Sequence, residues 1–194
     1  MSNINVFTNY YSEKKDRRRL ELEECVSNNV LNPHINYIPI VSQTRMKFND
    51  FFNIINDYTS DDDVNIICNL DIYFDNNITI AQRIKPGEFW CLARWDYKRN
   101  KKILHCNRPD SQDTWVFRGK MTKINADFEM GKRGCDNRLA FLAKEAGLNV
   151  TNPSKSVKTI HIHNSNIRNY NKRNKADLVR GPYHTITPTA LPQV

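Results

Sequence analysis

Residues 64–75 read Val-Asn-Ile-Ile-Cys-Asn-Leu-Asp-Ile-Tyr-Phe-Asp, and this stretch decides the fold. Its β-branched first half predicts a buried strand, which gives way to polar residues at Asn69, Asp71 and Asp75. Carboxylates at the carboxyl end of a buried strand lie where open α/β sheets bind ligands. Hard oxygen ligands of this kind suit Mg²⁺ or Mn²⁺ holding a phosphate, so we expect a metal site there. A strand followed by a solvated turn is the alternative.

The residues before this stretch alternate between strand and helix patterns. Residues 4–8 alternate as a short strand, and Ser12 is a candidate cap for a helix that runs to about Asn28. Residues 34–41 read as a second strand, which Pro39 places at a sheet edge or a strand end. A further helix is predicted by apolar residues spaced i, i+3, i+4 and i+7, namely Phe48, Phe51, Phe52 and Ile55. Strands and helices in this order predict an α/β sheet with parallel strands.

The second half of the chain has a less regular pattern. Residues 89–95 and 114–118 predict strands, separated by a basic hairpin or loop at 97–107. Residues 131–136, Gly-Lys-Arg-Gly-Cys-Asp, open a helix that Gly147 is well placed to end. We expect the three tryptophans in the core or in a pocket wall, with stacking on a sugar or base as the alternative; they are Trp90, Trp95 and Trp115.

Length and composition bound the class of protein. A chain of 194 residues can bury a core in one domain, or in a core plus an extension. No run approaches the roughly 18 apolar residues of a membrane span, and the first residues lack a secretory signal. We therefore expect a cytoplasmic location, which is the host cytoplasm if the chain is viral. The five cysteines show no CxxC pairing, which favours reduced thiols over a zinc site.

The net charge of +8 is unevenly distributed along the chain. Residues 48–82 hold seven Asp and no Lys or Arg, whereas residues 83–133 hold thirteen Lys and Arg against six acidic residues. Residues 151–194 hold seven Lys and Arg against a single Asp. An acidic pocket flanked by basic surface suits a metal site that faces a polyanionic partner. A basic surface without such a site is the alternative.

Four side chains are candidate metal ligands. Asp71 and Asp75 follow the buried strand, and the turn between them decides whether both converge. His161 and His163 lie two residues apart in an alternating strand at 159–163, so their rings share one face. Such a pair suits a metal or a phosphate, although polar side chains on a half-buried strand give the same pattern.

Two further carboxylates are candidate catalytic groups. Asp136 opens the helix after residues 131–135, where it is either a helix cap or a general base on an acceptor hydroxyl. Asp113 precedes the strand at 114–118 and is a second carboxylate of the same kind. Arg138, one turn into the same helix, is a candidate phosphate clamp, since a guanidinium can form paired hydrogen bonds with a phosphate.

Taken in order, these motifs resemble small nucleotide-sugar glycosyltransferases of the glycosyltransferase-A fold. The resemblance rests on strands ending in Thr8-Asn9-Tyr10 and Asn69-Leu70-Asp71, on the helix opened by Gly134-Cys135-Asp136, and on His161 and His163. It covers about residues 4–170 and is closest to small transferase-like proteins of phages, large viruses and bacteria. It implies a single three-layer, Rossmann-like domain over residues 1–170, with a nucleotide-binding half at 1–82, an acceptor half at 83–170, and a basic C-terminal arm at 171–194.

The resemblance also implies roles for individual residues. In this family an Asp-x-Asp motif binds Mn²⁺ or Mg²⁺, which holds the diphosphate of a sugar nucleotide; a UDP-sugar is the first candidate. Asp71 matches the second Asp, whereas the uncharged Asn69 replaces the first. His161 or His163 resembles a late metal ligand, and Asp136 resembles the base of inverting members. Residues expected to approach the nucleotide are Thr8, Asn9, Tyr10, and Arg17 or Arg18.

The leading hypothesis is therefore a metal-dependent transfer of a sugar to a hydroxyl on an anionic acceptor, with hydroxymethylated DNA as one candidate. One alternative is a metal-dependent nuclease that uses Asp71, Asp75, Asp113 and the histidines around one or two ions. Another alternative is a noncatalytic nucleic-acid or glycan binder with the same fold.

Overall fold

The computed structural model describes residues 2–98, 103–165, 167 and 174–193. Its main sheet has six strands in the order β2-β1-β3-β8-β5-β9. Their bounds are β1 (Ile4–Tyr10), β2 (Asn36–Val41), β3 (Val64–Cys68), β5 (Glu88–Leu92), β8 (Thr114–Arg118) and β9 (Asn149–Thr151). Strand β8 runs antiparallel to both of its neighbours, and the other five strands run in one direction. The fold is thus mixed α/β and compatible with a Rossmann-like arrangement.

A second, smaller sheet brings the late histidines to the end of β3. It has the order β4-β10-β6-β7, with β4 (Ile72–Tyr73), β6 (Trp95–Tyr97), β7 (Ile103–His105) and β10 (Ile160–Ile162). Strand β10 is antiparallel to β4, and His161 is the partner of Ile72. Because Ile72 directly follows Asp71, this pairing sets His161 beside the acidic end of β3.

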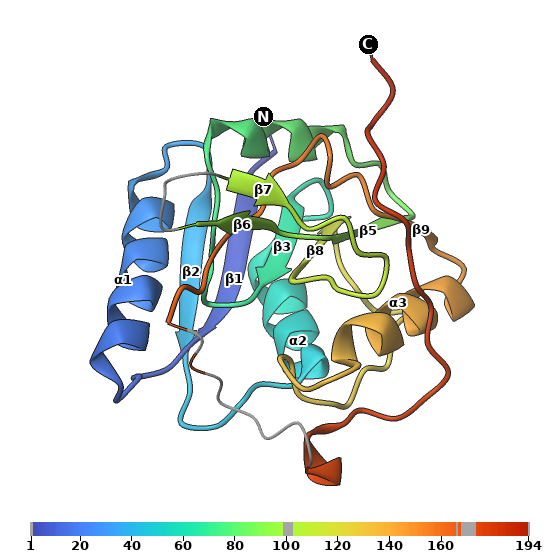
Figure 1. Cartoon of the computed structure of the whole chain (residues 1–194). Coiled ribbons are helices and arrows are strands. Elements are labelled where there is room, and N and C mark those ends of the chain that lie inside the picture. The colour runs from blue at the N-terminus through green and yellow to red at the C-terminus, as the bar shows by residue number, and fades with distance from the viewer. Residues whose placement is uncertain (1, 99–102, 166, 168–173, 194) are drawn as a thin grey trace.

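Helices and apolar clusters complete the layers. Helices α2 (Phe48–Tyr58) and α3 (Cys135–Glu145) share one apolar cluster with Phe7, Ile67 and Trp115 of the sheet, and so cover one face (Figure 1). The opposite face packs against the 3₁₀ helix η1 (Asn76–Arg83). Helix α1 (Asp16–Leu31) contacts β2, β4 and β10. The site described below lies at the carboxyl ends of the strands between these layers.

Most of the elements predicted from the sequence are confirmed. β1, β2 and β3 are parallel, and β3 is buried along its whole length. β2 is an edge strand, which accommodates Pro39 because an edge strand need not donate on its outer side. The four apolar residues predicted for one face of α2 are all buried. Gly147 follows α3 with a φ of 80°, a left-handed conformation that favours glycine.

The predicted cap of α1 is wrong. The helix begins at Asp16, the residue before it is Lys15, and no side chain caps it. Ser12 is exposed in the segment that leads from β1 to the helix. The helix also extends past Asn28 to Leu31, because Asn29 is buried against the 72–74 segment, where it bonds to the main chain of Ile72 and Phe74.

The C-terminal segment packs against the body of the protein. Residues 171–173 and 194 of the expected arm lie outside the described residues, and η2 (Lys175–Asp177) begins the described part. The Ile186 N–H donates to the Pro109 carbonyl at 2.9 Å, and the Thr189 N–H donates to the Asn152 carbonyl at 2.8 Å. Val179 and Ile186 are buried in the cluster with α2 and α3. The segment, red in Figure 1, runs past α3 as part of the fold, because its apolar residues pack into the core.

The predicted halves, residues 1–82 and 83–170, share one sheet, since β3 of the first half pairs with β8 of the second.

All five cysteines are free, in line with the expected reduced thiols. None of the helices in the described ranges has the length and apolar character needed to cross a bilayer.

Candidate functional site

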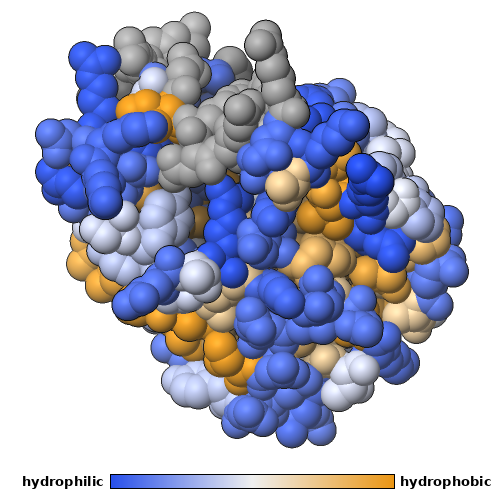
Figure 2. Space-filling view, turned by 90° about the horizontal axis from the view of Figure 1, so that it is seen from below, coloured by the Kyte–Doolittle hydropathy of each residue, from blue (hydrophilic) through white to orange (hydrophobic). Residues whose placement is uncertain are grey.

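A cavity of about 570 Å³ opens where β1 and β3 end. Strand β2 lies on one side of β1 and β3 on the other, so the chain connections diverge at this point. Such a switch point is where open α/β sheets bind ligands. Residues from both halves of the chain line the cavity, including Asn9, Asn69, Asp71, Asp113 and Asp136. Figure 2 views the molecule from this side, which is largely hydrophilic with apolar residues showing between the polar ones.

Asp71, His161 and His163 form a candidate metal-binding group. One ligand atom from each lies within 4.8 Å of the others. The Asp71 and His161 side chains are only 13% and 8% exposed, and Asp71 Oδ2 lies 3.1 Å from His161 Nε2. Asp71 Oδ1 and His163 Nε2 are buried and have no hydrogen-bond partner among the described residues. Each of these two atoms lacks a partner of the kind that a cation supplies, and two imidazoles with one carboxylate suit Mn²⁺ or another transition ion better than Mg²⁺.

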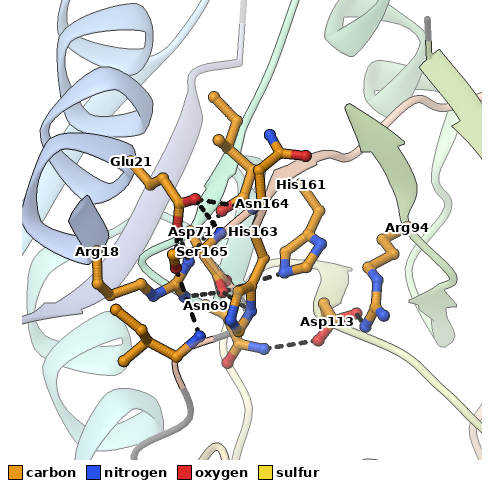
Figure 3. A network of polar contacts seen from close by, with 12 residues as sticks. Arg18, Glu21, Asn69, Asp71, Arg94, Asp113, His161, His163, Asn164 and Ser165 are labelled. Atoms are coloured by element: carbon orange, nitrogen blue, oxygen red, sulfur yellow. Dashed lines mark hydrogen bonds and ion pairs between the residues drawn. The ribbon is translucent and has the colours of Figure 1, made fainter. Parts of the chain in front are cut away.

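A chain of polar contacts supports His161 from behind, and Figure 3 shows the part of it formed by Arg94, Asp113 and Asn69. His161 Nδ1 lies 3.0 Å from Asp96 Oδ1, so the Asp96 carboxylate orients the ring. Arg94 links Asp96 to Asp113 through contacts of 2.9 and 3.0 Å. Asn69 Nδ2 then donates to Asp113 Oδ1 at 2.8 Å. The position of His161 is therefore coupled to that of Asn69 through three charged side chains.

Helix α1 supports the group from the other side. Arg18 forms an ion pair with Asp71 and donates to the Ile162 carbonyl at 2.9 Å. Glu21 lies 3.0 Å from Arg18 and accepts the N–H groups of Asn164 and Ser165 at 2.8 and 2.6 Å (Figure 3). These contacts fix the chain on both sides of His163.

The charges in this group shift the pKa values of its members. Burial acts to lower the pKa of His161, but Asp71 and Asp96 outweigh it and raise the pKa to about 9. Burial acts to raise the pKa of Asp71, but His161 and Arg18 outweigh it and hold the pKa well below the usual range. Asp71 therefore stays ionised, whereas His161 must give up a proton from Nε2 before that atom can bind a cation.

Asp136 lies on a different wall of the same cavity. Gly134, with a φ of 77°, is the residue at the start of α3, so Asp136 is in the first turn rather than at the predicted cap position. Only glycine adopts this left-handed conformation readily, which explains the shift. Asp136 Oδ2 accepts the Gln112 N–H at 3.2 Å. Burial raises the pKa of Asp136 to about 6, which suits a group that exchanges protons near neutral pH.

Other predicted residues lie elsewhere. Asp75 accepts the N–H of Asn77 at the start of η1 and lines a separate shallow cavity, because the chain turns after Asp71 into β4. Thr8, Tyr10 and Arg17 are not among the cavity-lining residues, whereas Asn9 and Arg18 are. Arg138 is also absent from the lining; its guanidinium lies over the Phe141 ring and donates to the Pro182 carbonyl, so it holds the C-terminal segment.

Sequence reasoning missed Glu21, Arg94 and Asp96. Between the two predicted candidates Arg17 and Arg18, the helical pattern favours Arg18. The buried face of α1 is formed at spacings of four, three and four by Arg18, Leu22, Cys25 and Asn29. Glu21 and Asp96 lie close in the chain to Arg18 and Arg94, but no local pattern indicates that they reach the site, because their contacts with Asn164 and His161 span 143 and 65 residues.

Comparison with known proteins adds no family assignment. No protein-family model matches this sequence, and no curated protein is significantly similar to it.

Proposed function

We propose that this chain is a metal-dependent glycosyltransferase of the glycosyltransferase-A type, which moves a sugar from a nucleotide-sugar donor to a hydroxyl acceptor. The observation that carries the proposal is the group of Asp71, His161 and His163 at the carboxyl end of β3. This group shares a cavity with Asp136, a carboxylate whose pKa is raised to about 6. A cation-binding group and a proton acceptor in one cavity are the two parts that this reaction requires.

The topology of the sheet supports a nucleotide donor. The cavity lies where the connections from β1 diverge, and doubly wound sheets bind nucleotides at this position. Its volume of about 570 Å³ is within the range of cavities that hold a small organic ligand.

Asp71, His161 and His163 would hold Mn²⁺, with Mg²⁺ as a second candidate. When bound, the cation supplies Lewis acidity that offsets the charge developing on the leaving diphosphate. Asp96 keeps His161 Nε2 directed toward Asp71. Arg18, which pairs with Asp71 and lines the cavity, adds positive charge on the side of α1.

Asp136 is the proposed general base. In its ionised form it accepts the proton of the incoming acceptor hydroxyl as the new glycosidic bond forms. Because a base on the acceptor side permits direct displacement, this assignment predicts inversion at the anomeric carbon. Asp113 is held by Arg94 and Asn69, so we assign it to positioning rather than to proton transfer.

Basic residues on the cavity wall support an anionic acceptor. Arg45, Lys132 and Arg133 line the cavity near the start of α3. Hydroxymethylated DNA is one acceptor of this class. Binding of a polyanion through these residues would weaken steeply as salt is added, and a flat salt dependence would count against it.

The nuclease alternative loses one of its proposed ligands, because Asp75 lines a different cavity from Asp71. Asp113 is engaged by Arg94. Within the described residues this leaves Asp71 as the carboxylate of the candidate metal group. A noncatalytic binder remains as the outcome in which ligands bind and no turnover occurs.

Calorimetry with sugar nucleotides tests the proposal. We expect UDP-sugars to bind the native protein in the presence of Mn²⁺ and to bind weakly after chelation. Asp71→Asn is expected to remove most of this metal-dependent affinity. Asp75→Asn is the matched control, since it makes the same change four residues away and retains an oxygen for the Asn77 N–H. Equal donor affinity in native protein and Asp71→Asn would overturn the metal assignment.

A further inference from the structure

Three buried polar side chains in the cavity have an atom without a hydrogen-bond partner and lie outside the metal group. Among the described residues, these atoms are Asn9 Nδ2, Gln112 Oε1 and Trp115 Nε1. The three residues are 7%, 3% and 1% exposed. Leaving buried polar groups unpaired is unfavourable, so native proteins rarely retain them without a partner such as water or a ligand.

A 180° turn of the Asn9 or Gln112 amide would break a hydrogen bond to the main chain, so the assignment of the unpaired atoms is fixed. Asn9 Oδ1 accepts the Met46 N–H at 3.2 Å, which directs Nδ2 away from that main-chain group. Gln112 Nε2 donates to the Pro109 carbonyl at 2.8 Å, which leaves Oε1 as the unpaired atom. The indole of Trp115 has only a donor to offer. Main-chain contacts therefore fix which atom of Asn9 and of Gln112 is unpaired, and together with Trp115 the set offers two hydrogen-bond donors and one acceptor.

These residues line the cavity that also holds the candidate metal group and the candidate base. Asn9 is two residues beyond Phe7 in β1 and so shares the sheet face on which Phe7 packs with Trp115. β3, whose end carries Asp71, runs between β1 and β8. The Gln112 N–H donates to Asp136, so Gln112 adjoins the other wall. In a sugar transfer, the group that extends from the diphosphate to the base is the sugar itself.

We propose that Asn9, Gln112 and Trp115 form a subsite for the hydroxyl groups of the transferred sugar. Asn9 Nδ2 and Trp115 Nε1 donate to oxygens of the sugar, and Gln112 Oε1 accepts from one of its hydroxyls. Met130 and Cys135, which line the same cavity, provide apolar contact for the C–H groups of the ring. A polyhydroxyl ligand suits this set because each hydroxyl both donates and accepts. The inference rests on the proposed function and specifies which part of the donor these residues recognise.

Trp115→Phe tests the subsite because it removes the hydrogen-bond donor Nε1 and retains an aromatic ring. We expect it to weaken binding of the preferred sugar nucleotide by about tenfold, the effect of one hydrogen bond to a ligand. Binding of the matching nucleoside diphosphate with Mn²⁺ is expected to stay unchanged. The measurement is calorimetry with UDP-glucose, UDP-galactose, UDP-N-acetylglucosamine and GDP-mannose, each compared with UDP or GDP.

Trp90→Phe is the matched control. Trp90 lies on the neighbouring strand β5, is also buried, and belongs to the cluster on the opposite face of the sheet, away from the cavity. This variant is expected to leave both affinities unchanged.

Asn9→Asp is a second test, because it keeps the oxygen that accepts the Met46 N–H and replaces the unpaired amide N–H group, Nδ2. The ratio of the two affinities is the readout, since it cancels any general effect of the added charge.

The outcomes separate the two proposals. If the native protein binds neither nucleoside diphosphates nor sugar nucleotides with Mn²⁺, the proposed function fails and the subsite fails with it. If the native protein binds both ligands but Trp115→Phe and Asn9→Asp leave their ratio unchanged, the subsite alone is overturned. Nucleoside diphosphate binding in the variants also shows that they are folded.

Discussion

Asp71 and Asp136 line the same cavity, but their surroundings act on them in opposite directions. Asp71 faces Arg18 and His161, which hold its pKa well below the usual range despite burial. Asp136 accepts main-chain N–H groups, which act to lower its pKa, but burial and the nearby Asp113 charge outweigh them and raise the pKa to about 6. Two carboxylates with divergent pKa values in one site are a common basis for divided roles in catalysis.

Asp71 and Asp136 are residues of the same type, so the difference between their pKa values comes from the charges and the burial around each carboxylate. Asp71 stays ionised over the whole physiological range and is therefore suited to a cation. Asp136 changes its protonation state near neutral pH and is suited to accept a proton.

The largest effect is expected for Asp136→Asn. The variant keeps an oxygen for the Gln112 N–H but cannot accept a proton, so the rate of transfer is expected to fall by about 10² to 10⁴. Donor affinity is expected to stay within about twofold because Asp71 and the histidines are untouched. Steady-state transfer rates and calorimetry on the same preparation check both halves. A variant with native transfer rates would exclude Asp136 as the base.

A smaller effect is expected for Asp96→Asn, which perturbs the Asp71 side. Asp96 orients His161 without lining the cavity, and loss of such a support weakens metal binding by about 10- to 100-fold. Mn²⁺ affinity measured by calorimetry is the readout. Asp110→Asn is the control, since Asp110 pairs with Arg108 outside the cavity. Equal losses in both variants would show that the effect is unspecific.

The pH dependence of transfer distinguishes the two carboxylates. At saturating Mn²⁺ the rate is expected to be constant above about pH 7, because Asp136 is ionised there. Below its pKa of about 6 the rate is expected to fall about tenfold per pH unit as the base becomes protonated. Asp71 does not titrate in this window. A rate that stays flat down to pH 5 would contradict the assignment of Asp136.

The smallest effect concerns stability. The folded pKa of Asp136, about 6, lies above its unfolded value near 3.8, so the folded state favours the protonated form. The free energy of unfolding therefore loses this contribution as the pH rises from about 4 to about 6. Asp136→Asn removes the buried charge and is expected to raise the free energy of unfolding at pH 8 by on the order of 1 kcal/mol.

Urea unfolding at pH 8 and at pH 4 measures this change. The gain is expected at pH 8 and should be absent at pH 4, where the native carboxyl is already protonated. A gain of equal size at both pH values would mean that the charge of Asp136 is not its source.

The sequence predicted the elements that depend on local patterns. The β-branched run of β3 and the apolar face of α2 follow from residues close together in the chain, and the parallel direction of β1, β2 and β3 follows from the alternation of strands and helices. The alternation at 159–163 also predicted that His161 and His163 share a face, and the structure brings both to Asp71.

The sequence did not predict the features that depend on tertiary pairing. Asp71 and Asp75 are equivalent by pattern, and only the pairing of β4 with β10 sends one into the cavity and the other to η1. The same holds for Asp96, which reaches His161 through the pairing of β6 with β10. Chain direction at the start of α3 is set by Gly134 in a left-handed conformation, which displaced the expected cap at Asp136.

The central claim is that Asp71, His161 and His163 together hold a divalent cation that binds the donor diphosphate. Crystals grown with Mn²⁺ and UDP test it directly through the anomalous signal of manganese. We predict one strong peak in contact with Asp71, His161, His163 and the diphosphate. A peak at Asp75 or elsewhere on the surface, or density for UDP without manganese at these three residues, would contradict the account.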